Sequence, residues 1–223
     1  MRSGQVDGRA IAFENRQDAG RKLARKLSER DFDNPLILAL PRGGVPVAYE
    51  VAKALGAQMD LLFVKKIGAP GWPEYGIGAV VDGASPQIVL TEEIVRQIRP
   101  SPEYIEAETQ RQLREIARRR SAYLGDREPI DIEDRTVIIV DDGIATGGTV
   151  KAALKGVRQN KPRKIILAVP VAPPSALEEL RNECDEIVCL YTPSPFGAVG
   201  SFYRDFGQTS DSEVVSLMSR MDF

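Results

Sequence analysis

Histidine is absent from this chain, and cysteine and tryptophan are scarce. Its 223 residues include no histidine, two cysteines and one tryptophan. Without histidine the chain cannot build a Ser-His-Asp hydrolytic triad, and it lacks the commonest general base of enzymes. Cys184 and Cys189 do not have the CxxC spacing of zinc ligands, so we interpret them as reduced thiols that pack in the interior. The composition excludes triad hydrolysis and argues against a zinc site.

Long apolar runs and a large excess of one charge are also missing. No run approaches the roughly 20 apolar residues that span a bilayer, and residues 1–13 lack the apolar core of a secretion signal. The formal net charge is −2, so no overall basic field attracts nucleic acid or an anionic membrane. We expect a cytoplasmic protein with no membrane partner, in which any anion site is local.

One stretch, Val137 to Leu154, combines several structural signals. Its first four residues form a β-branched run typical of a strand that is buried on both faces. Asp141 and Asp142 follow, then a turn of small residues, then apolar positions at helical spacing: Val150, Ala153, Leu154 and Val157. The pattern predicts a strand, an acidic pair, a glycine-containing loop and a helix, in that order.

This order suits a phosphorylated sugar. A loop that enters a helix offers unpaired backbone N–H groups and the positive end of the helix dipole to a phosphate. Glycines keep side chains away from such a group, while Thr146 and Thr149 add hydroxyl donors. Ionised Asp141 and Asp142 only accept hydrogen bonds, which fits vicinal sugar hydroxyls or the waters around a cation. The alternative is a tight turn after a buried strand, with acids that merely cap the helix.

A second loop of this kind occurs earlier in the chain. Leu36 to Leu40 is predicted to be a buried strand, and it is followed by Pro41-Arg42-Gly43-Gly44 and by apolar residues at helical spacing. Such a loop exposes backbone N–H groups beside one guanidinium, a pairing that matches a pyrophosphate. A plain connection between strand and helix is the alternative.

The apolar run with DD and TGGT resembles the phosphoribosyl pyrophosphate signature of the type I phosphoribosyltransferases, and PRGG resembles that family's pyrophosphate loop. The resemblance covers residues 36–190. It implies that Asp141 and Asp142 hold the ribose 2′ and 3′ hydroxyls, with Mg²⁺ between those hydroxyls and the pyrophosphate. The 5-phosphate would be held by Ala145, Thr146, Gly147, Gly148 and Thr149. The pyrophosphate would be held by Arg42, Gly43 and Gly44, in a loop that often has a non-proline cis peptide.

Asp60 to Val64 is predicted to be the next strand, ending at Lys65 and Lys66. Consecutive side chains on a strand point to opposite faces, so one of these lysines can face a site. The resemblance implies pyrophosphate contacts here. We place Lys66 with the catalytic acids and Lys65 with the binding residues, but which lysine points inward is left open. A solvated basic edge is the alternative.

Residues 68–78 are rich in glycine and proline and include Trp72 and Tyr75. They predict either a mobile loop that closes over the substrate, as the resemblance implies, or an ordered hairpin tip with its aromatic residues packed against the body. Beyond them, Gly78 to Val81 and Gln87 to Leu90 are predicted to form a small antiparallel flap.

The alternation of strands and helices predicts an α/β fold over a single domain, residues 1–223. Its centre is a Rossmann-like parallel sheet flanked by helices, as in the type I phosphoribosyltransferases, with a flexible-loop flap, a helical insertion at 91–125, and a small hood with a closing helix at 191–223. The predicted helix over 103–124 carries many arginines but also glutamates, which favours a solvated face or a subunit contact in a homodimer over nucleic acid.

The resemblance implies a transferase that uses phosphoribosyl pyrophosphate and Mg²⁺, releases pyrophosphate, and modifies a nitrogenous acceptor. Ala145 stands where enzymes acting on 6-oxopurines carry aspartate, which argues against hypoxanthine and guanine. The chain is most similar to bacterial predicted phosphoribosyltransferases whose acceptor is unidentified. The alternative on the same fold is a non-catalytic sensor of phosphoribosyl pyrophosphate or a nucleotide. An esterase or phosphatase is disfavoured, and no metal ligands are assigned among the residues.

Overall fold

The centre of the molecule is a parallel five-stranded sheet with strand order β2-β1-β6-β7-β8. The computed structural model describes residues 11–221, so both ends of the predicted 1–223 domain lie outside the described residues. The strands of this core sheet are β1 (Pro35–Ala39), β2 (Gln58–Leu61), β6 (Thr136–Val140), β7 (Lys164–Val171) and β8 (Glu186–Tyr191).

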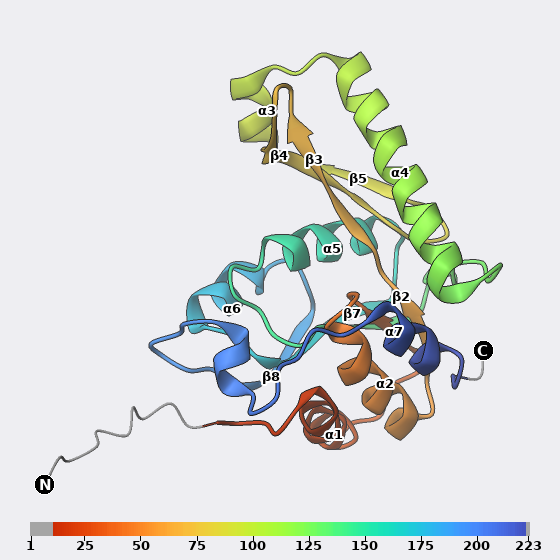
Figure 1. Cartoon of the computed structure of the whole chain (residues 1–223), viewed down its shortest axis with the longest axis vertical. Coiled ribbons are helices and arrows are strands. Elements are labelled where there is room, and N and C mark those ends of the chain that lie inside the picture. Colours follow the sequence, from red (N-terminus) through yellow and green to blue (C-terminus); the bar gives the residue numbers. More distant parts are fainter. Residues whose placement is uncertain (1–10, 222–223) are drawn as a thin grey trace, which may run out of the picture.

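Helices cover both faces of the core sheet, as unbroken apolar strands require (Figure 1). Leu36 pairs with Val137 and packs with the helices of one face, whereas Ile37 pairs with Ile138 and packs with those of the other. The first face carries α5 (Gly148–Gln159) and α6 (Pro174–Leu180). The second carries α1 (Arg16–Leu27), α2 (Gly44–Leu55) and α7 (Asp211–Met218). This confirms the predicted α/β fold with a Rossmann-like sheet.

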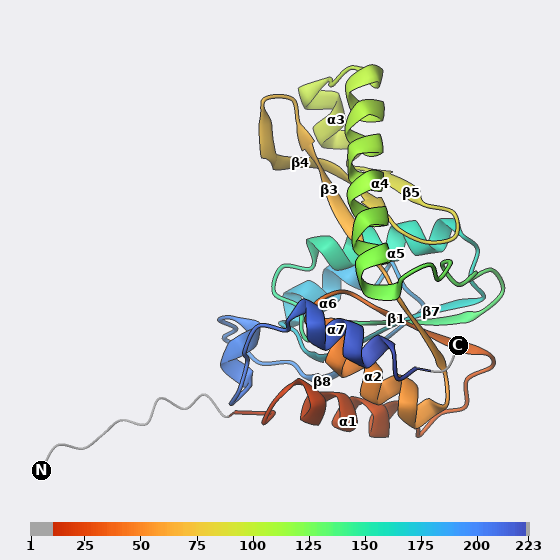
Figure 2. The same ribbon diagram turned by 45° about the vertical axis from the view of Figure 1, so that its right-hand side comes forward.

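A second, antiparallel sheet stands above α5 and forms the predicted flap (Figure 2). Its strands, in spatial order, are β3 (Val64–Ala69), β4 (Trp72–Val81) and β5 (Gln87–Leu90). The short helix α3 (Glu92–Ile98) and the long helix α4 (Pro102–Leu124) follow in the chain and rise beside it. Helix α3 and most of α4 lie beside the flap, whereas the C-terminal end of α4 packs on α7 and in the core cluster.

The predicted strand from Asp60 to Val64 is wrong in its bounds. The chain leaves the core sheet after Leu61 and enters the flap at Val64, so Lys65 and Lys66 lie inside β3 and not at the end of a core strand. Leu62 and Phe63 between the strands are buried. An apolar run that stays buried throughout gives no signal of the point at which it changes sheets.

Residues 68–78 form an ordered β-hairpin, which corrects the expectation of a loop. Its turn lies between Ala69 and Trp72. A Cβ atom on Gly68 would lie 2.5 Å from the carbonyl oxygen of Pro73, and one on Gly78 would lie 2.5 Å from that of Val89. Glycine is needed here because the strands approach closely, not because the chain is irregular. Trp72 is 69% exposed, so it does not pack against the body as the hairpin alternative supposed.

A buried ion cluster joins the core, the flap and α4. Arg120 of α4 contacts the carboxylate of Asp60 in β2 at 2.9 Å and that of Asp82 after β4 at 2.7 Å. All three side chains are almost completely buried. Nearby arginines of α4 pair instead with glutamates of the same helix: Arg111 with Glu108, and Arg118 and Arg119 with Glu115. The basic character of this helix is thus largely balanced.

The segment between β8 and α7 is irregular except for the 3-10 helix η1 (Val199–Phe202). Its aromatic side chains, among them Phe202 and Tyr203, pack on Phe13 from the start of the described chain. The side chain of Ser210 accepts a hydrogen bond from the backbone N–H of Glu213 at 3.1 Å, so Ser210 caps α7. Neither α7 nor any other helix of the described residues is long and apolar enough to cross a bilayer.

Candidate functional site

The two glycine-containing loops of the sequence meet at one edge of the core sheet. They follow β1 and β6, which are neighbouring parallel strands with Ala39 opposite Val140. From β1 the chain continues to β2 on one side, and from β6 to β7 on the other, so this edge is a topological switch point. Ligands of open α/β sheets bind at such points.

The first loop is pressed directly against the acidic pair. A Cβ atom on Gly43 would lie 2.1 Å from Oδ2 of Asp142, and one on Gly44 would lie 2.7 Å from the carbonyl oxygen of Val140. Any side chain at these glycines would displace the strand end or the carboxylate. The peptide between Pro41 and Arg42 is cis, as the resemblance implied. The structure therefore brings the loop at 41–44 and both acids together.

Burial is the main influence on the pKa values of the two acids, and it raises both. Burial raises the pKa of Asp141 well above its ordinary value, and the neighbouring charge of Asp142 adds to the effect. Oδ1 of Asp141 accepts a hydrogen bond from the backbone N–H of Asp142 at 2.8 Å. Burial also raises the pKa of Asp142, but an arginine opposes that rise.

That arginine is Arg16 of α1, which the sequence analysis missed. Its Nε donates to Oδ2 of Asp142 at 2.8 Å, and its Nη1 donates to the carbonyl oxygen of Gly207 at 2.5 Å. Its guanidinium carbon lies 3.9 Å from the ring centroid of Phe206. Tyr203 also holds Asp142, since its hydroxyl donates a hydrogen bond to the backbone carbonyl oxygen of that residue at 2.5 Å. In the sequence Arg16 is one of many basic residues, with nothing to connect it to residue 142.

The second loop opens towards solvent at the start of α5. Gly147 precedes the helix with φ of 78°, a conformation that favours glycine, and no side chain caps the helix there. Ala145, Thr146, Gly148 and Thr149 are exposed. A Cβ atom on Gly148 would meet nothing within 4 Å. The loop thus presents backbone and threonine hydroxyls to open space, as a phosphate site requires.

Lys65 and Lys66 point to opposite faces of β3. Lys66 lines a cavity of about 900 Å³ together with Thr146, Gly148 and Thr149. Its ammonium group donates to the carbonyl and the carboxylate of Glu74 at 2.9 and 3.0 Å. Lys65 faces α4 instead, where burial lowers its pKa and Nζ lies 3.9 Å from Oε1 of Glu115. Of the two lysines, Lys66 is the one beside the second loop.

Arg42 is turned towards the helices. Its Nη1 lies 3.1 Å from Oδ1 of Asp211 at the start of α7, and the hydroxyl of Tyr123 donates to the same oxygen at 2.6 Å. Within the described residues no hydrogen bond or ion pair joins Arg42 to Lys66. The structure brings Gly43, Gly44 and the acids together, and Lys66 and the second loop together, but it leaves Arg42 and Lys65 outside both groups.

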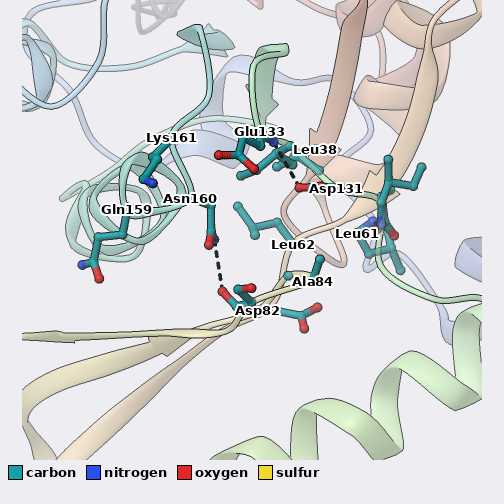
Figure 3. Close-up of a pocket in the computed structure, with 15 residues that line it drawn as sticks. Leu38, Leu61, Leu62, Asp82, Ala84, Asp131, Glu133, Gln159, Asn160 and Lys161 are labelled. Carbon is teal, nitrogen blue, oxygen red and sulfur yellow. Dashed lines mark hydrogen bonds between the residues drawn. The ribbon is translucent and has the colours of Figure 1, made fainter.

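Another cavity lies beside the ion cluster, near the C-terminal end of α5 (Figure 3). It has a volume of about 300 Å³ and is lined by Asp60, Asp82, Asn160 and residues 130–133, among others. Its buried carboxylates are held by Arg120, and the side chain of Asn160 donates to the carbonyl of Ser85 at 3.1 Å. These polar groups serve the junction of core and flap and are not available as a phosphate site.

Comparisons with known proteins identify the family to which the chain belongs. The family model of the phosphoribosyl transferase domain matches residues 12–206. A Mycobacterium tuberculosis (strain H37Rv) protein named for a proposed phosphoribosyl transferase activity is 44% identical over 208 residues, which are 93% of this chain and 46% of that protein. The chain thus spans about half the length of this curated relative.

Two further likenesses differ in extent. The crystal structure of TT1426 from Thermus thermophilus is 41% identical, has a TM-score of 0.81, and is matched over 93% of this chain and 98% of that one. A uracil phosphoribosyltransferase of Desulfitobacterium hafniense (strain DCB-2) is 32% identical over 79 residues, which are 35% of each protein. Because the family model covers most of the chain, the protein belongs to the phosphoribosyl transferase domain family.

Proposed function

We propose that this chain transfers the phosphoribosyl group of phosphoribosyl pyrophosphate to a nitrogenous acceptor and releases pyrophosphate. The observation that carries the proposal is the contact between the first loop and the acidic pair, in which Gly43 lies directly against the carboxylate of Asp142. A pyrophosphate on the first loop and a ribose above the acids would then be adjacent, as they are within one substrate molecule. Family membership and the open phosphate loop support the same assignment.

In the proposed reaction, the bond from C1 to the pyrophosphate oxygen breaks and the acceptor nitrogen forms a bond to C1. Asp141 and Asp142 accept hydrogen bonds from the ribose hydroxyls and stabilise positive charge at C1. Residues 145–149 hold the 5-phosphate, and the loop at 41–44 holds the leaving pyrophosphate, with Lys66 above the site. A good leaving group needs little activation of the nucleophile, so positioning supplies most of the rate enhancement.

In this proposal, magnesium enters the site bound to the substrate. Among the described residues no group of His, Cys, Asp or Glu is arranged to hold a metal. The neighbouring carboxylates of Asp141 and Asp142 fit the waters around a cation that is bound mainly by phosphates. Mg²⁺ would supply neutralisation of the pyrophosphate charge.

Calorimetry with a double variant tests the assignment. Asp141→Asn with Asp142→Asn keeps the side-chain shape and removes both charges. Hydrogen bonds to charged groups contribute about 1.5–3 kcal/mol each, so affinity for phosphoribosyl pyrophosphate with Mg²⁺ should fall at least about 100-fold. Asp126→Asn, at an exposed linker position, is the matched control and should bind normally. Undiminished binding by the double variant would refute the assignment.

A sensor that binds phosphoribosyl pyrophosphate without turnover is the second candidate. Two contacts favour it. Lys65 faces α4 and Asp142 is paired with Arg16, so part of the predicted basic and acidic machinery is engaged by the protein itself. Pyrophosphate release measured across a panel of bases and amines separates the candidates. Turnover supports the transferase, and binding without turnover supports the sensor.

The organisation of the whole protein is also part of this proposal. Four features remain predictions: the helical insertion at 91–125, the hood at 191–223, the use of this hood to recognise the acceptor, and a homodimer. We propose a cytoplasmic location because Cys184 and Cys189 are free thiols, which persist in reducing compartments.

A further inference from the structure

The cavity of about 900 Å³ beside the phosphate loop extends well beyond that loop. We call it the flap cavity. Its walls come from β3, β4 and β5 above and from α5 below, and its basic and hydroxyl side chains are Lys66, Thr91, Thr146, Thr149, Lys151 and Lys155. Figure 1 shows α5 running beneath the flap sheet. The cavity therefore continues from the 5-phosphate position along the exposed side of this helix.

One phosphate group does not fill this space. Pockets of about 300–1,000 Å³ hold whole drug-sized ligands, so the flap cavity can take a much larger group. Lys151 and Lys155 are one turn apart on the same helical face. Lys155 lies about 9 Å along the helix axis from Thr149, by the rise of about 1.5 Å per residue. A phosphate held at Thr149 is therefore too far away to contact Lys155.

The charge of the cavity favours an additional anion. Its lining includes Lys66, Lys151 and Lys155 and a single acid, Glu92. Lys151 makes no ion pair within the described residues. Nζ of Lys155 lies 3.6 Å from Oε1 of Glu183, which does not line the cavity. Lys66 forms an ion pair with Glu74, whose side chain is 97% exposed and can therefore move away from the lysine.

We infer that the flap cavity binds the outer phosphates of a ribose 5-diphosphate or 5-triphosphate, such as a nucleoside triphosphate. The inner phosphate sits on the loop at 145–149 and the outer ones reach Lys151 and Lys155. This inference rests on the proposed function, because it uses the same phosphate loop. It gives the site a class of competing ligand: a nucleoside triphosphate that displaces phosphoribosyl pyrophosphate.

Calorimetry with adenosine 5′-mono-, di- and triphosphate, and with the uridine series, tests the inference in buffer with EDTA. Each added phosphate should tighten binding about fivefold, the upper range for an exposed ion pair. In Lys151→Met with Lys155→Met the increase should vanish. Lys53→Met, the same change on an exposed position of α2, should keep it. Lys155→Met alone should leave the affinity for phosphoribosyl pyrophosphate unchanged.

The outcomes separate the two proposals. If phosphoribosyl pyrophosphate binds but affinity does not increase with phosphate number in either nucleotide series, the flap-cavity inference is overturned and the proposed function stands. An increase seen with one base only also overturns it, because the phosphates would then not be the determinant. Absence of any phosphoribosyl pyrophosphate binding overturns the proposed function itself.

Discussion

Replacing Arg16 by methionine should destabilise the protein in a pH-dependent way. The substitution keeps the apolar stem and removes the guanidinium that holds Asp142 at 2.8 Å. The side chains of Arg16 and Asp142 are only 12% and 14% exposed, so water replaces little of the lost contact. Removing one partner of a buried ion pair costs about 3–5 kcal/mol. Because the pair is slightly exposed, we expect about 3 kcal/mol at neutral pH.

The pH dependence follows from the pKa of Asp142. Burial raises that pKa in the folded protein above the value of about 3.9 for an unfolded chain. A carboxyl group with a raised folded pKa contributes stability at low pH and loses that contribution as pH rises through the folded pKa. Arg16 lowers this pKa, so its removal raises it further. The loss of stability in Arg16→Met should therefore shrink as the pH is lowered from about 7.5 to about 5.

Urea unfolding followed by far-ultraviolet circular dichroism at both pH values measures the effect. Trp72 is a poor fluorescence probe because it is largely exposed in the native state. Arg21→Met is the matched control, since Arg21 lies on the exposed side of α1. The free energy of unfolding of this variant should change by less than about 0.5 kcal/mol. If Arg16→Met loses under about 1 kcal/mol at the higher pH, or if its loss is the same at both pH values, the reasoning is wrong.

Three further predictions concern the junction, the first loop and the last helix. Arg120→Met should lower the free energy of unfolding in urea by about 3–5 kcal/mol, because it leaves two buried carboxylates without their positive partner. Arg118→Met, at an exposed position of the same helix, should unfold almost as the parent does. Gly43→Ala should abolish detectable binding of phosphoribosyl pyrophosphate in calorimetry, since its Cβ would lie 2.1 Å from Asp142; normal affinity would show that the loop moves freely. Ser210→Ala should lower the free energy of unfolding by about 1 kcal/mol through loss of the helix cap, and no change would mean that α7 frays without effect.

Local sequence determined most of the core strands, most helices and both loops of the candidate site. Buried parallel strands are continuous apolar runs, and helices repeat their apolar positions every three or four residues, so Val137 to Val140 and the stripe of α5 could be identified from the sequence. The glycines of PRGG and TGGT could be identified for a related reason. At Gly43 the backbone approaches a carboxylate so closely that a side chain has no room, and at Gly147 the positive φ favours glycine.

Tertiary structure alone decided the partners of those residues. Arg16 and Asp142 are 126 positions apart, and no local pattern connects them. Lys65 and Lys66 are adjacent in the sequence, yet β3 turns one towards α4 and the other towards the flap cavity. The change of sheet after Leu61 and the glycine contacts of the hairpin are likewise set by neighbours distant in the chain. A side chain's type is fixed by the sequence, but its environment depends on elements that meet it only after folding.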